Sequence, residues 1–114
     1  MNDYSSLLVS VLKQILPTYN EFTLTAKTKT PCISYMLNNN YEIAIGDTMG
    51  YSAISYTVKI WGHDLAMLNE YCAEIDRRLK PIGFKRNGTN MLSDKNSTMI
   101  QIIMDYEALA SENY

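Results

Sequence analysis

The chain has 114 residues, of which 46% are hydrophobic and 19% are charged, and its formal net charge at pH 7 is −2. This length fits one domain, and the apolar content excludes an intrinsically disordered chain. The negative balance argues against sequence-specific binding to nucleic acid, because such binding depends on clustered basic side chains that meet phosphates.

The first predicted element is a helix from about Asp3 to Leu16, which Pro17 ends. Asp3 or Ser5 can cap its start by accepting hydrogen bonds from free backbone N–H groups. Its apolar side chains recur with the helical period and therefore predict one buried stripe. The stripe consists of Leu7, Leu8, Val11, Leu12, Ile15 and Leu16.

The threonine-rich segment 18–30 is predicted to be a loop, although Phe22 and Leu24 alternate with threonines and leave a short edge strand open. Pro31 then introduces a strand from Cys32 to Leu37. Three asparagines at 38–40 predict a turn, after which 41–45 alternates as the returning strand of a hairpin.

A second turn is predicted at 46–50, where two glycines flank Asp47, Thr48 and Met49. It leads into the longest predicted strand, from Tyr51 to Trp61. The even-numbered side chains of this strand are apolar, so we expect them to face the core. They are Ile54, Tyr56, Val58 and Ile60.

A second helix is predicted from about Leu65 to Lys80, with Asp64 as its N-cap and Pro81 as its end. Its expected buried stripe comprises Leu65, Leu68, Cys72, Ile75 and Leu79. A dense basic cluster follows, which we interpret as a solvated helix end. It contains Arg77, Arg78, Lys80, Lys85 and Arg86.

The C-terminal part is predicted to contain two strands and a loop. Residues 83–86 begin the first strand, 87–96 form a polar loop, and 98–106 form the final strand. The core face of that strand carries Ile100, Ile102, Met104 and Tyr106. Residues 107–114 are predicted to be a flexible tail.

This order of elements predicts a single α+β domain over residues 1–114. Neighbouring strands joined by short turns indicate an antiparallel sheet of four to five strands. Two amphipathic helices are expected to pack on one face, which would complete a two-layer sandwich.

Residues that could carry chemistry are few. One histidine, His63, and two cysteines, Cys32 and Cys72, are too few for a structural zinc site. Both cysteines are expected to be buried thiols, and His63 an exposed connector beside the helix cap Asp64. We therefore predict a protein that is not an enzyme and has no catalytic residues, metal or cofactor.

No apolar run approaches the roughly 20 residues that cross a bilayer, so no membrane partner is predicted. Ser10, Lys13 and Gln14 interrupt the N-terminal apolar stretch, which argues against a secretory signal. We expect a protein that is made and folded in the cytosol.

The nine tyrosines fall mostly on or beside predicted strands. Strand propensity accounts for them as well as an interaction surface does, and both interpretations stay open. Exposed strand edges would also invite strand addition by a neighbouring subunit.

Several segments resemble the tail-terminator, or tail-completion, proteins of long-tailed bacteriophages. The resemblance extends to about Tyr106 and is carried by patterned strand ends. The segments are the helix that leads to Pro17, Pro31-Cys32-Ile33-Ser34-Tyr35, the run from Ser55 to Gly62, Gly83-Phe84-Lys85-Arg86, and the final strand that ends in Tyr106.

The resemblance implies a structural virion protein that forms a ring, usually hexameric, on the head-proximal end of the tail tube. Such a ring stops tube polymerisation and presents a surface to the head. The implied partners are the protein itself, the tail tube protein and the head–tail connector protein. The implied location is the virion tail, after synthesis in the cytoplasm of a bacterial host.

The predicted contact loops of this ring are the polar segments 46–50 and 87–96, because polar loops can become ordered on binding. Their candidate residues are Asp47, Thr48, Met49, Asn87, Asn90, Asp94 and Lys95. The predicted subunit-edge strand carries Tyr41, Ile43 and Ile45.

Three alternatives stay open. A neck or head-completion protein of the same particle would have a closely similar sequence pattern. A small module that binds a ligand or peptide would be favoured by a deep pocket lined by Tyr35, Tyr56 and Trp61. An enzyme with a site across a subunit interface would need a cluster of carboxylates or histidines.

Overall fold

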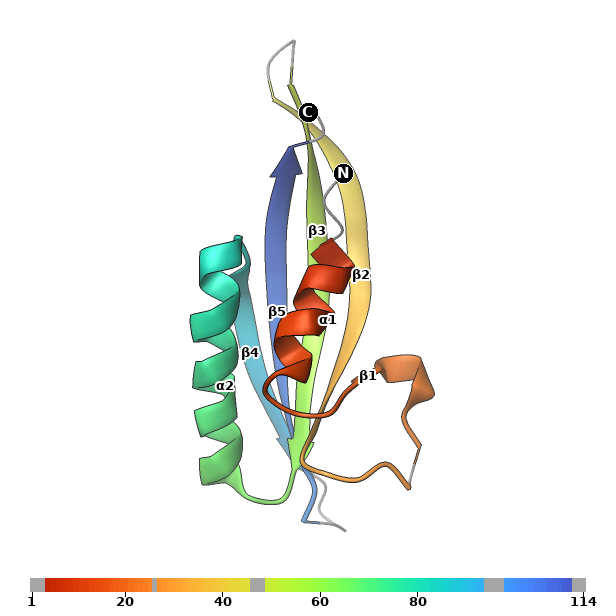
Figure 1. Ribbon diagram of the computed structural model, residues 1–114, viewed down its shortest axis with the longest axis vertical. Coiled ribbons are helices and arrows are strands. Elements are labelled where there is room, and N and C mark those ends of the chain that lie inside the picture. Colours follow the sequence, from red (N-terminus) through yellow and green to blue (C-terminus); the bar gives the residue numbers. More distant parts are fainter. Residues whose placement is uncertain (1–3, 26, 46–48, 94–97, 112–114) are drawn as a thin grey trace.

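The computed structural model describes residues 4–25, 27–45, 49–93 and 98–111, with the side chains of 5–25, 27–38, 54–93 and 98–108. The chain folds as α+β, as predicted, around an open five-stranded sheet with two helices (Figure 1). The elements in chain order are α1 (Tyr4–Lys13), β1 (Thr18–Asn20), the 3-10 turn η1 (Glu21–Thr23), β2 (Cys32–Ile45), β3 (Met49–Gly62), α2 (Leu65–Leu79), the 3-10 turn η2 (Lys80–Ile82), β4 (Lys85–Ser93) and β5 (Ile100–Ser111).

The strands lie in the order β1-β2-β3-β5-β4. The β2–β3, β3–β5 and β5–β4 pairs are antiparallel, whereas β1 is parallel to β2. The predicted all-antiparallel sheet is therefore wrong, and the sheet is mixed. The chain returns from α1 along the edge of β2, where Ile33 donates its backbone N–H to the carbonyl of Pro17.

The segment 18–30 was predicted as a loop, but its first three residues form β1. The alternative strand around Phe22 and Leu24 is also wrong, because Phe22 lies in η1 and Leu24 caps its end. The Asn20 side chain accepts a hydrogen bond from the Phe22 backbone N–H, which starts this tight turn directly after the strand.

The predicted turn at 38–40 is absent, because residues 32–45 form one continuous strand. A β-bulge between Leu37 and Asn39 absorbs one asparagine. Asn38 donates its side-chain amide to the hydroxyl of Thr57 on β3 at 2.5 Å. The hairpin therefore joins β2 to β3, with Ile45 opposite Met49, and the connecting residues 46–48 lie outside the described residues.

Both C-terminal strands are longer than predicted. Residues 87–93 of the expected loop belong to β4, with a second bulge between Arg86 and Gly88. Residues 107–111 of the expected tail belong to β5, where Ser111 pairs with Tyr51. Strand β3 has 14 residues and offers β5 a long edge with which to pair. The length of a strand here follows the length of its neighbouring strand rather than the polarity of its own residues.

One cluster of buried side chains forms the core and joins both helices to the sheet. Ile54, Tyr56, Val58 and Ile60 of β3 are buried, as predicted, together with Ile102, Met104 and Tyr106 of β5. The helices contribute Leu8, Leu12, Leu68, Cys72, Ile75 and Leu79. Leu16 joins them from the segment after α1, which ends at Lys13 and not at Leu16 as predicted. Leu7 and Leu65, at 40% and 39% exposed, are the two predicted stripe residues that the core leaves out.

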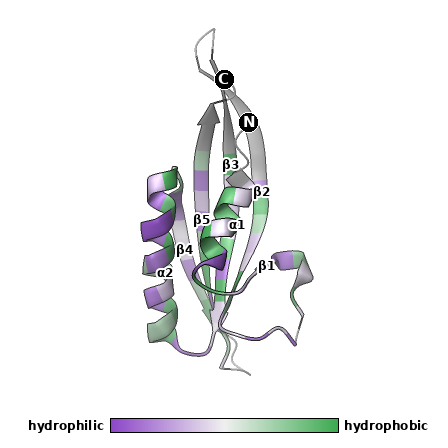
Figure 2. Cartoon of the chain, in the orientation of Figure 1, coloured by the Kyte–Doolittle hydropathy of each residue, from purple (hydrophilic) through white to green (hydrophobic). Residues whose placement is uncertain are grey.

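The predicted start of α2 is confirmed, because the Asp64 carboxylate accepts a hydrogen bond from the Met67 backbone N–H. Along α2, buried apolar residues alternate with charged ones, and the helix is divided by hydropathy, whereas α1 is mostly apolar (Figure 2). No helix of the described residues is long and apolar enough to cross a bilayer.

The molecule is elongated, with extents of 54 × 25 × 23 Å. The β2–β3 hairpin accounts for much of this length, because it extends beyond both helices (Figure 1). Among the described side chains, the core cluster reaches as far as Ile54 on β3 and Ala108 on β5.

Candidate interaction surfaces

Three of the seven predicted contact residues lie in strands rather than in loops. Asn87 and Asn90 lie in β4 and are exposed. Met49 is the first residue of β3. Asp47, Thr48, Asp94 and Lys95 lie outside the described residues.

The predicted subunit-edge residues Tyr41, Ile43 and Ile45 all belong to β2. Only residues 33–35 of β2 pair with the short strand β1. Residues 36–45 pair with β3 on one side and with no described strand on the other. Their backbone N–H and C=O groups on that side form an open edge.

The opposite edge of the sheet is β4. All nine of its residues are exposed, and β5 is its one strand partner among the described residues. Met91 and Leu92 are 54% and 53% exposed, which is unusual for large apolar side chains in a strand. Apart from Lys85 and Arg86 at its start, β4 carries no charge or proline that would oppose strand addition.

A groove of about 800 Å³ lies between the C-terminal half of α2 and the start of β4. Its apolar wall comes from Ala73, Gly83 and Phe84. Its charged lining consists of Asp76, Arg77, Lys80, Lys85 and Arg86. Most of the predicted basic cluster therefore surrounds one hollow, while Arg78 turns away and donates a hydrogen bond to Gln14 of α1 at 3.1 Å.

A polar network fixes one wall of this groove. Asp76 accepts a hydrogen bond from the buried Tyr106 hydroxyl and forms an ion pair with Arg86 at 3.0 Å. Burial and the Asp76 hydrogen bond raise the pKa of Tyr106 far above its ordinary value. Burial also raises the pKa of the Cys72 thiol to about 11, so this thiol is neutral at pH 7.

Cys32 and Cys72 are buried free thiols, as predicted. Burial raises the pKa of Cys32 too. Buried neutral thiols are poor nucleophiles, because the thiolate is the reactive form. Neither cysteine therefore has the environment of a catalytic residue.

His63 is exposed beside the helix cap, as predicted, and its Nδ1 lies 2.7 Å from the Thr98 hydroxyl. No group of three or more His, Cys, Asp or Glu side chains in the described part of the chain is placed to hold a metal ion.

The ligand pocket that a binding module would need, lined by Tyr35, Tyr56 and Trp61 together, is not formed. Tyr56 is 2% exposed in the core and packs edge-on against Phe84, with ring centroids 6.1 Å apart. Trp61 has the opposite parity on the same strand, and its indole N–H donates to Ser34 at 2.9 Å. Tyr56 and Trp61 thus point to opposite faces of the sheet.

The face that carries Trp61 is tied together by polar side chains. Thr57 donates its hydroxyl to Asp105 at 3.0 Å, which links β3 to β5. Lys59 pairs with Glu21 of η1 and lies 5.8 Å from the Trp61 ring. The Lys59–Glu21 pair holds η1 against the sheet.

Comparison with models of known protein families and with curated proteins gives no match to this chain. The groove and the open edge of β4 were both missed from sequence. Exposed apolar residues Met91 and Leu92 within a polar segment were the available signal for the strand. No local signal could place Lys85 and Arg86 beside Lys80 across the groove.

Proposed function

We propose that this chain is a structural virion subunit that forms a ring on the head-proximal end of a phage tail tube. The ring stops tube polymerisation and helps to join the tail to the head. The tail location rests on the resemblance of the sequence segments named above. The assembly role is supported by one structural observation, the two open edges of a single sheet.

The directions of the edge strands suit head-to-tail association. Three successive antiparallel pairings separate β2 from β4, so the two edge strands run in opposite directions. If copies repeat around an axis that is nearly parallel to the strands, β4 of one copy meets β2 of the next in antiparallel orientation. Such a heterologous contact closes into a ring when the rotation between copies allows it.

The two edges are also offset along the strands. Thr89, in the middle of β4, is level with Tyr35 through Met104 and Val58. The free edge of β2, residues 36–45, has its centre about five residues beyond Tyr35, which is a distance of roughly 17 Å along the strand. The four strands β2, β3, β5 and β4 of one copy together span roughly 19 Å across the sheet. A shift of roughly 17 Å over this width corresponds to a strand tilt of about 40° from the ring axis, as in closed barrels.

A matched pair of variants tests the edge. Met91→Lys places a charge on β4, whereas Met67→Lys makes the same change at a 41% exposed residue of α2. Each variant would be expressed in cells that produce particles with the native gene inactivated. We expect Met67→Lys to restore tails of regular length and Met91→Lys to leave them irregular, because a charged edge opposes strand addition.

The decisive measurement is electron microscopy of particles made with the gene inactivated. Tails of abnormal and variable length support the terminator role. Detached tails of normal length beside full heads would instead assign the chain to the neck or to head completion. Normal infectious particles would remove the assembly role altogether.

A further inference from the structure

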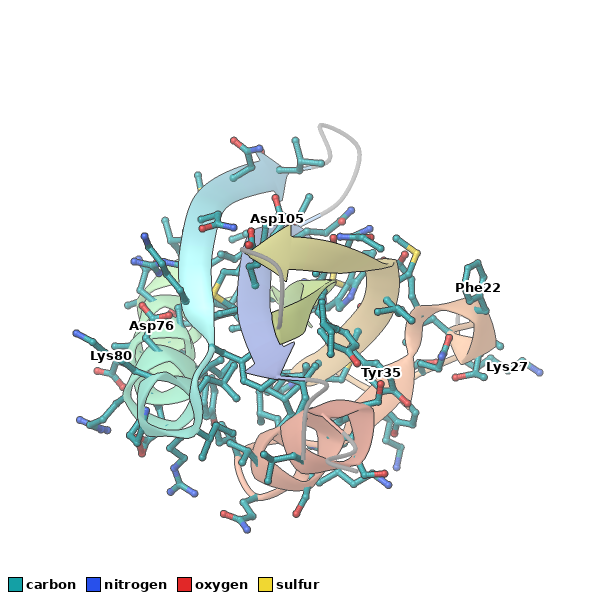
Figure 3. All side chains as sticks on the ribbon, turned by 90° about the horizontal axis from the view of Figure 1, so that it is seen from above. Phe22, Lys27, Tyr35, Asp76, Lys80 and Asp105 are labelled. Atoms are coloured by element: carbon teal, nitrogen blue, oxygen red, sulfur yellow. The ribbon has the colours of Figure 1, made fainter. Side chains whose placement is uncertain are left out.

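The groove between α2 and β4 lies where the charge of the chain is most concentrated. Residues 74–86 contain five basic and two acidic side chains, a net charge of +3, while the rest of the chain carries −5. A protein of net charge −2 thus has a net positive segment beside this groove. Figure 3 shows Asp76 and Lys80 on the side opposite Phe22 and Lys27.

Stabilisation of the helix end explains only part of this charge. Arg77, Arg78 and Lys80 complement the negative end of the α2 dipole. Lys85 and Arg86 come after a left-handed turn at Gly83, whose φ is 100°, and belong to β4. Arg86 pairs with Asp76 of α2, whereas Lys85 has no ion pair with the helix in the described part of the chain.

Two of the four groove cations are already neutralised. Arg77 donates hydrogen bonds to Glu74, and Arg86 pairs with Asp76. Lys80 and Lys85 have no ion pair within the described part of the chain. The groove is therefore lined by two lysines that have no carboxylate partner among the described residues.

The wall of the groove is apolar and rigid. Phe84 is 3% exposed and is held by the Tyr56 ring, and η2 with its αL glycine fixes the path of the backbone. An apolar wall with cations at its rim suits a peptide that carries both carboxylates and an aliphatic side chain. A nucleic acid backbone would use the cations and leave the wall uncovered.

We propose that this groove binds an acidic segment of a partner polypeptide. Its carboxylates pair with Lys80 and Lys85, and an aliphatic side chain between them contacts the exposed Ala73 on the groove wall. The site is a property of the single chain and does not depend on ring formation, so its test can fail while the proposed function stands.

The probe is a fluorescein-labelled octapeptide of alternating glutamate and leucine, whose binding to the full chain is followed by fluorescence anisotropy. The double variant Lys80→Glu/Lys85→Glu is expected to weaken binding about tenfold or more. The double variant Lys27→Glu/Lys29→Glu makes the same charge change on exposed lysines elsewhere and is expected to change affinity less than about twofold. Urea denaturation of each protein verifies folding.

Two further probes separate the ligand classes. A peptide with serine in place of leucine should bind several-fold more weakly, because it leaves the apolar wall uncovered. A labelled twelve-residue oligothymidylate should bind more weakly than the octapeptide. The proposal is overturned if the octapeptide does not bind, if both double variants weaken it equally, if the serine peptide binds as well, or if the oligonucleotide binds more tightly.

Discussion

At the scale of single residues, the fold depends on a few side chains that the sheet buries completely. Met104 is 0% exposed on β5, whereas Met91, on the neighbouring strand β4, is 54% exposed. The two methionines have the same chemistry and differ in environment, so they provide a matched pair for measuring the contribution of the core.

We expect Met104→Ala to lower the free energy of unfolding by about 2–5 kcal/mol, because it removes buried apolar surface and leaves a cavity. Met91→Ala should change it by less than about 0.5 kcal/mol. Urea denaturation followed by circular dichroism measures both values. Equal losses for the two variants would mean that Met104 does not lie in the packed core.

The buried thiols and Tyr106 predict a loss of stability in alkaline solution. Folding raises the pKa of Cys72 from 9.0 to about 11, so the neutral thiol stabilises the folded state fully below pH 9. As the pH rises from 9 to 11, the unfolded state loses this proton first, and stability falls by about 1.4 kcal/mol per pH unit at most. The raised pKa values of Cys32 and Tyr106 act in the same direction.

Urea denaturation under reducing conditions at pH 8, 9 and 10 checks this expectation. Cys72→Ala should have a shallower decline between pH 9 and 10 than the parent chain, because its unfolded state has one fewer thiol to ionise. A decline that is identical in the variant would assign the alkaline effect to other groups.

At the scale of elements, the connection from β3 to α2 depends on a glycine. A Cβ atom at Gly62 would lie 2.8 Å from Cδ2 of Leu68, which is 1% exposed in the core. Gly62 thus allows the first turn of α2 to pack directly on the end of β3. Gly88, at the bulge of β4, has no atom within 4 Å of the corresponding position.

We expect Gly62→Ala to destabilise the chain by about 1–3 kcal/mol, because Leu68 must shift within a packed core. Gly88→Ala should have little effect or stabilise slightly, since it meets open space and its φ is not positive. The midpoints of thermal unfolding of the two variants test this difference. A neutral Gly62→Ala variant would show that Leu68 can move without cost.

At the scale of the whole molecule, the helices and the sheet cover different lengths. The β2–β3 hairpin extends beyond both helices, so one end of the elongated sheet lacks their cover (Figure 1). The central strand β3 runs through the covered part of the sheet and the uncovered part. It pairs with β2 and β5 at residues 51–53 as well as at 56–60.

Backbone amides of residues 51–53 should therefore exchange hydrogen at least about tenfold faster than those of 56–60 in the isolated chain, because less packing opposes local opening. Hydrogen exchange followed by NMR measures both groups within one strand. If the proposed ring forms, the difference should shrink on assembly. Uniform protection along β3 in the isolated chain would contradict the expectation.

Patterns within single segments were enough to predict most of the core, although Ala108 of the expected tail also belongs to it. Periodicity predicts the buried residues of β3 from Ile54 to Ile60 and the stripe of α2 from Leu68 to Leu79. The hydrogen-bonding capacity of one side chain predicts the Asp64 cap. The α+β class followed from the order of these elements. All of these features depend on residues close together in the sequence.

Only the tertiary structure decided where the strands end and what lies beside them. The bulge at Asn38, the strand character of 87–93 and the extension of β5 through 107–111 depend on pairing partners that lie between 7 residues away, for Ser93 and Ile100, and 60 residues away, for Tyr51 and Ser111. Backbone groups pair wherever a neighbouring strand presents partners, and this overrides the local preference of polar residues for turns. For the same reason, the two open edges and the groove that joins Lys80 to Lys85 arise only in the folded chain.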